Sequence, residues 1–356
     1  MTVKIKISYA DLVNALLGNL PDREREVLQK RNALSNFPKY TLEQIGKDFN
    51  ITRERVRQIE KEGLKKIKSL DFDKANLPIN DLQSLIFEYL KKHGGAMAEN
   101  HLMENLLPEQ KAEEEKALSF ILVSVLADKL ARVDNSEEYH PIWKMENVNL
   151  DETLEVVRAL KGIIEKHGKP LALTDLQDKF QGHELYNKVD QNEADNQAII
   201  EALLRLRKDI NRNILSHWGL NQWNTIRPKR MTDKAYLILS REKKPLHFAT
   251  VADLINQANF DNKKACPATV HNELILDDKY VLVGRGIYAL REWGYQEGTV
   301  ADIIASILQD KGSLAKKDLI DEVLKQRIVQ KTTITLALMD KNKFARTQDG
   351  TYKLAK

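Results

Sequence analysis

The chain has 356 residues, of which 42% are hydrophobic and 30% are charged, with a formal net charge of +4. No apolar run reaches the roughly 18 residues of a membrane-spanning helix, and the N-terminus lacks a charged leader followed by a continuous apolar segment. The single cysteine, Cys266, excludes an internal disulfide and a multi-cysteine zinc site. We therefore expect a cytoplasmic, helix-rich chain of two or more domains that does not enter a membrane.

Charge is distributed unevenly along the chain. Residues 1–70 have a net charge of +6, residues 71–228 a net charge of −8, and residues 229–356 a net charge of +6. A basic N-terminal segment suits contact with a phosphate backbone, whereas an acidic middle would be repelled by it. The same charges also suit solvated helix faces, so charge alone leaves both interpretations open.

The first predicted helices lie between residues 20 and 50. The stretch LPDREREVLQKRNAL, residues 20–34, begins with a Leu-Pro-Asp helix start and has an apolar stripe typical of a support helix. In the stretch TLEQIGKDF, residues 41–49, the hydroxyl of Thr41 can cap the first turn. A short break at Asn50 and Ile51 follows this second helix.

The next helix is predicted within ITRERVRQIEKEGLKKIK, residues 51–68, with Thr52 as its N-cap. Apolar or small residues recur at helical spacing and form one stripe: Val56, Ile59, Gly63 and Ile67. The face turned away from this stripe holds Arg53, Glu54, Arg57, Gln58 and Lys61. Two capped helices joined by a short break predict a helix-turn-helix.

The polar face of this helix has the chemistry of base readout. Arginine can bond bidentately to guanine, glutamine to adenine, and glutamate can accept from cytosine. Arg55 and Lys65 flank the face, where phosphate contacts are expected. The alternative is a solvated helix stabilised by Arg and Glu pairs at three- and four-residue spacing.

Residues 20–68, and TRERVRQIE in particular, closely resemble the fourth conserved region of the primary sigma factors of bacterial RNA polymerase. The resemblance implies that Arg53, Glu54, Arg57 and Gln58 read bases of double-stranded promoter DNA. Backbone contacts are expected from Thr41, Thr52, Arg55, Lys61 and Lys65. It also implies that the domain docks on the flap of the polymerase β subunit, through the apolar side of the support helices.

The resemblance covers only about fifty residues. About twenty residues precede it, and nothing downstream resembles the core-binding and promoter-melting region of a sigma factor. The resemblance therefore implies contact with a promoter or with the polymerase, but not promoter opening by this chain alone.

From about residue 80 the chain repeats one plan, in which three helices are followed by a two-stranded end. Gly284-Arg285-Gly286 and Asp349-Gly350 are turn signals at two of the hairpin tips. This plan predicts winged helices, so the expected fold class is mainly α, with an N-terminal helix-turn-helix domain and tandem winged-helix units. The predicted domains are residues 1–72, 80–147, 150–227, 229–293 and 297–356.

Aromatic residues close each predicted unit, and they are expected in the cores where the hairpins pack on the helices, with base stacking as the alternative. They are Trp143, Trp223, Tyr288, Trp293 and Tyr352. The stretch PEQKAEEEKALSF, residues 108–120, is predicted to be a polar insertion. Because the two middle units are acidic, we expect them to contact protein or act as spacers rather than bind DNA.

The last two units resemble the HARE-HTH domain, which occurs at the N-terminus of the δ subunit of Gram-positive RNA polymerase. The residues behind this resemblance are KPLHFATVADLI and GSLAKKDLIDEVL, followed by GIYAL and GTYKL. These units contain the secondary DNA candidates Lys263, Lys264, Arg285 and Lys331, whose charges could follow a DNA backbone or simply keep the protein soluble.

No catalytic constellation is predicted. A phosphate-binding Gly-rich loop is lacking, the eight histidines do not have metal-ligand spacing, and Cys266, just before the expected helix start at Pro267, is expected to be inert. We therefore expect no cofactor and no enzyme. The first hypothesis is a DNA-binding transcription factor; the alternatives are a polymerase accessory subunit or sigma antagonist working by protein contact, and a nucleic-acid enzyme with an unrecognised site.

Overall fold

The computed structural model describes residues 8–107, 111–126, 130–189 and 193–355. These residues form a mainly helical protein in which small antiparallel sheets follow groups of helices, which confirms the predicted fold class. The chain divides into two units, Met1–Asn211 and Arg212–Lys356, and each is described by itself. The five predicted domains are a finer division than this one and stay a prediction.

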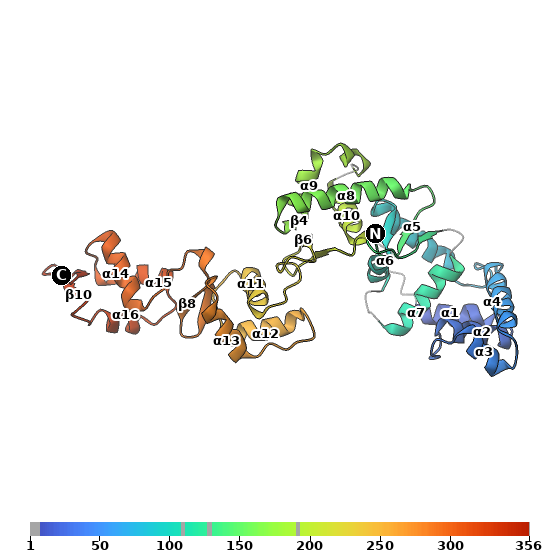
Figure 1. The fold of residues 1–356 in the computed structure, drawn as a ribbon, viewed down its shortest axis with the longest axis horizontal. Helices are drawn as coiled ribbons and strands as arrows, with labels where there is room; N and C mark the ends of the chain where they lie inside the picture. Colours follow the sequence, from blue (N-terminus) through green and yellow to red (C-terminus); the bar gives the residue numbers. More distant parts are fainter. Residues whose placement is uncertain (1–7, 108–110, 127–129, 190–192, 356) are drawn as a thin grey trace. The chain divides into compact units, whose positions relative to one another are not determined.

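The N-terminal part of the first unit is built from four helices (Figure 1). They are α1 (Tyr9–Gly18), α2 (Asp22–Asn32), α3 (Leu42–Phe49) and α4 (Arg53–Lys68). The sequence analysis predicted the last three and missed α1. Its signal is present in the sequence, because Ser8 caps the helix by accepting a hydrogen bond from the Asp11 N–H.

The next part of the first unit contains three helices, a π-helical turn and a three-stranded sheet. The elements are α5 (Ile79–Lys92), β1 (Ala96–Ala98), α6 (Glu99–Leu106), α7 (Ala112–Phe120), η1 (Ile121–Val125), β2 (Ala131–Val133) and β3 (Ile142–Lys144). β3 lies between β1 and β2 and is antiparallel to both. Trp143 on β3 is buried, as predicted.

The predicted polar insertion at residues 108–120 is wrong for its larger part. Residues 108–110 lie outside the described residues, but residues 112–120 form α7. Its first turn is acidic, whereas Ala117, Leu118 and Phe120 near its end are buried. The helix has only a few apolar residues, and they follow three glutamates in its first turn, so the sequence pattern does not reveal an amphipathic helix.

The rest of the first unit and the start of the second contain α8 (Leu150–His167), β4 (Leu171–Ala172), α9 (Leu173–Gln181), η2 (Glu184–Lys188), α10 (Glu193–Leu206), β5 (Ile210–Arg212) and β6 (His217–Leu220). The predicted core residue Trp223 is only half-buried. Trp218, on β6, is buried instead, and so are the next two residues, Gly219 and Leu220, so both faces of this strand are covered.

The second unit repeats one plan twice. The first copy contains α11 (Met231–Glu242), β7 (Leu246–His247), α12 (Phe248–Ala258), α13 (Pro267–Leu276), β8 (Tyr280–Gly284), β9 (Ile287–Leu290) and η3 (Arg291–Trp293). The second contains α14 (Val300–Lys311), α15 (Lys316–Gln326), α16 (Lys331–Ala337), β10 (Phe344–Arg346) and β11 (Tyr352–Leu354).

Each copy ends in a hairpin with glycine at the predicted turn. Gly286 and Gly350 have φ angles of 68° and 82°, in the left-handed region that glycine adopts without strain. Tyr288, on β9 of the first hairpin, is buried, and Trp293 and Tyr352 are partly buried against the cores of their own copies. These three aromatic residues therefore lie where the sequence analysis placed them.

The two copies in the second unit are joined along β8. In the sheet order β7-β9-β8, β8 is an edge strand, and the backbone N–H of Ile328 donates to the carbonyl oxygen of Val283 at 2.8 Å. The buried guanidinium of Arg327 donates to the carbonyls of Leu282, Gln296 and Gly298. Residues of the last copy thus satisfy part of an otherwise open strand edge.

Candidate nucleic-acid interface

The angle between α3 and α4 is set by a tight turn of the backbone. Asn50 ends α3 in the left-handed conformation, and the Ile51 N–H donates to the Gly46 carbonyl at 2.9 Å. A Cβ on Gly46 would lie 2.8 Å from the Ile51 carbonyl oxygen, so the turn requires glycine there. The sequence analysis placed Asn50 in the break after this helix, but it did not predict the left-handed conformation of Asn50 and did not single out Gly46.

Side-chain caps fix the starts of both helices. The Thr41 hydroxyl accepts from the Gln44 N–H while the Gln44 side chain accepts from the Thr41 N–H, which is a capping box. The Thr52 hydroxyl accepts from the Arg55 N–H at 3.2 Å and so begins α4. Both predicted caps are confirmed, and both threonines remain exposed.

The two faces of α4 have the predicted composition. Its buried stripe is Val56, Ile59, Gly63 and Ile67, and three of these four residues pack in cores with α2 or α3. The predicted base-reading residues Arg53, Glu54, Arg57 and Gln58 are all exposed, as are the backbone candidates Arg55, Lys61 and Lys65. The fold therefore leaves this polar face open to solvent.

Two pairs organise the exposed face. Arg57 forms a fork with Glu54, with its Nε and Nη2 at 2.9 and 2.6 Å from the two carboxylate oxygens. The hydrogen bonds from Arg57 lower the pKa of Glu54, and the same pairing raises the pKa of Arg57, so both groups stay charged. Arg55 Nη1 donates to the side-chain oxygen of Gln58 at 3.1 Å.

The fork leaves most of the Arg57 guanidinium available. A guanidinium has five N–H donors, and the bonds to Glu54 occupy only two of them. The Nη1 side can still make a bidentate contact with guanine. Arg53 makes no hydrogen bond or salt bridge among the residues that the structure describes, so its whole guanidinium is available.

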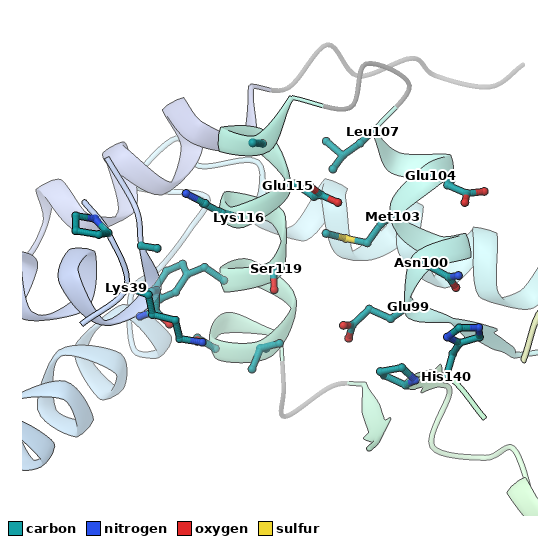
Figure 2. Close-up of a pocket in the computed structure, with 18 residues that line it drawn as sticks. Lys39, Glu99, Asn100, Met103, Glu104, Leu107, Glu115, Lys116, Ser119 and His140 are labelled. Carbon is teal, nitrogen blue, oxygen red and sulfur yellow. The ribbon is translucent and has the colours of Figure 1, made fainter. Parts of the chain in front are cut away.

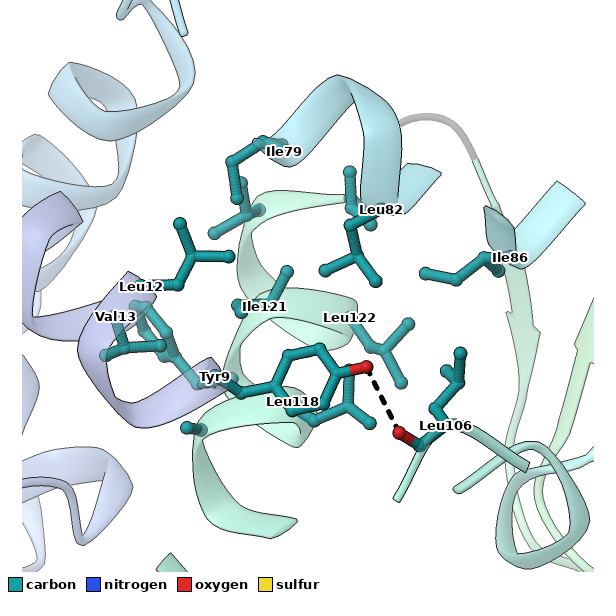
Figure 3. Close-up of a cluster of buried hydrophobic side chains, with 14 of the residues drawn as sticks. Tyr9, Leu12, Val13, Ile79, Leu82, Ile86, Leu106, Leu118, Ile121 and Leu122 are labelled. Atoms are coloured by element: carbon teal, nitrogen blue, oxygen red, sulfur yellow. Dashed lines mark hydrogen bonds between the residues drawn. The ribbon is translucent and has the colours of Figure 1, made fainter. Parts of the chain in front are cut away.

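The apolar side of the support helices is covered by the chain itself. Residues of α1, α2 and α4 share one core with α7 and η1; among them are Leu12, Leu16, Leu28, Ile67, Leu118, Ile121 and Leu122. Figure 3 shows the part of this core that contains Leu12 of α1, Leu118 of α7 and Ile121 of η1. The buried Tyr9 hydroxyl donates to the Leu106 carbonyl at 3.2 Å, and Glu114 on α7 accepts from the Tyr9 N–H at 2.6 Å. The predicted flap contact would therefore compete with packing inside this unit.

The secondary DNA candidates lie in the second unit and are exposed. Lys263 and Lys264 precede α13, and Arg285 lies in the turn between β8 and β9. Lys331 is the first residue of α16, in the other copy. Three of the four candidates thus belong to one three-helix unit, at positions before its third helix and at its hairpin tip.

One cavity in the first unit is lined by residues of α6 and α7. A cavity of about 940 Å³ opens between α6 and α7, where Met103 and Glu115 face each other across the gap (Figure 2). Within the described ranges no group of three or more His, Cys, Asp or Glu residues could hold a metal ion, and no helix is long and apolar enough to span a membrane.

The comparisons with known proteins agree on the N-terminal helices. The family model for sigma-70, region 4 matches residues 16–69. Residues 16–69 are a sigma-70 region 4 domain. The matched residues contain the whole of α2, α3 and α4, and hence every predicted base-reading residue.

The similar proteins are RNA polymerase sigma factors by name. "RNA polymerase sigma factor SigA" of Lactococcus lactis subsp. cremoris is 40% identical over 63 residues, and that of Microcystis aeruginosa is 50% identical over 58 residues. The aligned parts are 18% and 16% of this chain and 17% and 14% of those proteins. The similarity is confined to the region 4 domain, and the resemblance of the last two units to HARE-HTH domains stays a prediction.

Proposed function

We propose that this chain is a non-catalytic transcription factor that uses its region 4 domain to bind promoter-like double-stranded DNA, at promoters or on RNA polymerase. The observation that carries the proposal is the open face of α4, where four side chains suited to base readout project from a helix whose opposite stripe is buried. The region 4 domain itself is a DNA-binding helix-turn-helix domain of transcription proteins. The proposal requires no cofactor and no promoter melting by this chain.

In the proposed complex α4 enters the major groove with its first turns against the base edges. Arg53 and the free side of Arg57 would bond guanine, and Gln58 would bond adenine. Thr41, Thr52 and Arg55 lie at or near the starts of α3 and α4, where backbone N–H groups and hydroxyls favour phosphates. The interface thus combines sequence readout with backbone contacts that set the register.

The test is selection of a preferred duplex from a random library, followed by binding of variants to that duplex and to random DNA. Arg53→Ala and Gln58→Ala should each cost about 1–3 kcal/mol on the preferred duplex and much less on random DNA. Arg158→Ala, an exposed arginine on α8, is the matched control and should change neither affinity. Equal losses on both DNAs would argue against base readout.

A second candidate is a polymerase accessory subunit or sigma antagonist that acts by protein contact. The net charge of −8 on residues 71–228 favours it, because this part of the chain would be repelled by DNA. Under this candidate, binding to purified polymerase core survives Arg53→Ala and Gln58→Ala unchanged. Absence of core binding by the wild-type chain would remove this candidate and leave the first.

A further inference from the structure

The third helices of the two repeated copies in the second unit occupy equivalent positions. α13 and α16 begin at Pro267 and Lys331, and β8 and β10 begin at Tyr280 and Phe344, so the members of each pair are 64 positions apart. The turn glycines Gly286 and Gly350 have the same spacing. The two segments 267–279 and 331–343 can therefore be compared residue by residue.

Both segments expose large apolar side chains. On α13 Ile275 is 59% and Leu276 is 81% exposed, and in the α16 segment Leu336 is 66% and Met339 is 65% exposed. Ile275 and Met339 are equivalent positions. Because these side chains are exposed within the single chain, neither segment covers the other, and clustered exposed apolar side chains of this kind mark interaction surfaces.

The chemistry of α13 argues against DNA as its partner. Residues 267–276 contain no lysine or arginine and include Glu273. A helix that enters a DNA groove usually presents several cations and amides to phosphates and bases, whereas this segment supplies one amide, Asn272, beside the acidic Glu273 and an apolar end. A protein surface is the better fit.

The two segments are opposite in charge. Residues 267–279 contain Glu273, Asp277, Asp278 and Lys279, for a net charge of −2. Residues 331–343 contain Lys331, Asp340, Lys341 and Lys343, for a net charge of +2. Asp278 and Lys341 form no salt bridge within the described part of the chain. The same molecule thus carries one apolar end with an acidic margin and one apolar end with a basic margin.

We infer that the α13 end of one copy of the chain packs against the α16 end of a second copy, and reciprocally. A two-fold symmetric dimer contains this contact twice, because each chain supplies one acidic and one basic end. The apolar side chains are buried at the centre of each contact, and the opposite margins select the pairing and oppose contact between like ends. This inference is independent of the proposed DNA binding.

The joint along β8 makes reciprocal docking possible. Ile328, three residues before α16, is bonded to Val283 on the strand that follows α13, and Arg327 holds three carbonyls beside it. The two ends are therefore carried by one connected body rather than by freely moving copies. A dimer with two simultaneous contacts gains from that preorganisation.

The experiment is sedimentation equilibrium of the full-length chain without DNA. The wild-type chain should form dimers. Leu276→Asp or Met339→Asp should each raise the dissociation constant of the dimer by roughly tenfold or more, which is the size of effect expected for a central interface residue. Val123→Asp changes an exposed apolar residue of the first unit and should have no effect. Circular dichroism melting confirms that each variant is folded.

A mixture of the two aspartate variants distinguishes reciprocal docking from nonspecific hydrophobic association. Each single variant disrupts both contacts of its own homodimer, whereas a mixed dimer of Leu276→Asp with Met339→Asp keeps one intact contact and should form at concentrations where either variant alone is monomeric. Asp278→Lys should also weaken the dimer, and the double variant Asp278→Lys, Lys341→Asp should restore it. A monomeric wild-type chain, a dimer that tolerates both aspartate variants, or a mixture that stays monomeric would overturn the inference.

Discussion

Glu54 and Arg57 lie one turn apart on the face of α4 that is proposed to read DNA, and two hydrogen bonds of 2.9 and 2.6 Å join their side chains. The carboxylate thereby orients the guanidinium while leaving its outer edge open. It also places a negative charge where phosphates would approach. The pair therefore has opposite effects on general affinity and on selectivity.

Replacing Glu54 with glutamine should separate these effects. The change removes a negative charge from the DNA face and the charged fork that orients Arg57, so Glu54→Gln should bind random DNA more tightly and discriminate less between preferred and random duplexes. Fluorescence anisotropy on both duplexes at several salt concentrations measures this. An unchanged ratio of the two affinities would show that the fork has no part in readout.

Gly46→Ala tests the turn that aims α4. The added methyl would meet the Ile51 carbonyl oxygen at 2.8 Å, and because that atom is backbone, α4 must shift relative to α3. DNA affinity should fall although no exposed residue of α4 changes. The control is Gly162→Ala in α8, where the methyl meets nothing within 4 Å, and it should stabilise the chain by about 0.5–1 kcal/mol through helix propensity. Equal effects of the two changes on DNA binding would contradict this account.

Tyr9 should make the first unit sensitive to alkali. Burial, together with the nearby Glu114 carboxylate, raises the pKa of Tyr9 from 10.0 to about 12. Since the folded state favours the neutral phenol, this stabilisation is complete below pH 10 and is lost as the pH rises through about 12, which amounts to about 2–3 kcal/mol.

Tyr9→Phe should remove that pH dependence at a cost of only about 1 kcal/mol at neutral pH, because one hydrogen bond to the Leu106 carbonyl is lost while the ring still fills its site. Urea unfolding at neutral pH and near pH 11 measures both effects. If the two proteins lost stability in parallel between these values, the phenol of Tyr9 would not be the group responsible.

Arg327→Met should loosen the joint between the two copies of the second unit. The methionine fills part of the volume, but the carbonyls of Leu282, Gln296 and Gly298 lose a charged donor, at about 1–3 kcal/mol for each buried group left unpaired. Hydrogen exchange should accelerate at the Ile328 amide. Arg346→Met, on the exposed hairpin of the last copy, should leave that amide unchanged. Equal exchange rates in both variants would mean that the backbone bond alone holds the joint.

Much of the candidate site was predictable because its signals are local. Thr41 and Thr52 cap helices within three residues of themselves, and the stripe from Val56 to Ile67 repeats within one helix. Side chains on such a helix have directions set by its 3.6-residue period, so the exposure of Arg53, Glu54, Arg57 and Gln58 followed from spacing. The hairpin turns at Gly286 and Gly350 were predictable for the same reason.

Other features were not predictable because their partners are distant in sequence. The packing of α1 against α7 depends on contacts such as the hydrogen bonds from Tyr9 to Leu106 and Glu114, which lie about one hundred positions away in the sequence. Trp218 and Trp223 differ in burial because of what covers each of them, which no local pattern records.

The amino-acid sequence by itself thus determined the helix-turn-helix, its caps and its polar face, since backbone hydrogen bonding and helical periodicity act over a few residues. Only the tertiary structure decided that α7 and η1 cover the support side of that domain, and that Arg327 and Ile328 complete the edge of β8. Both arrangements depend on contacts between segments that are distant in sequence. The apolar area and the strand edge that become buried are set by the two surfaces together and not by either segment alone.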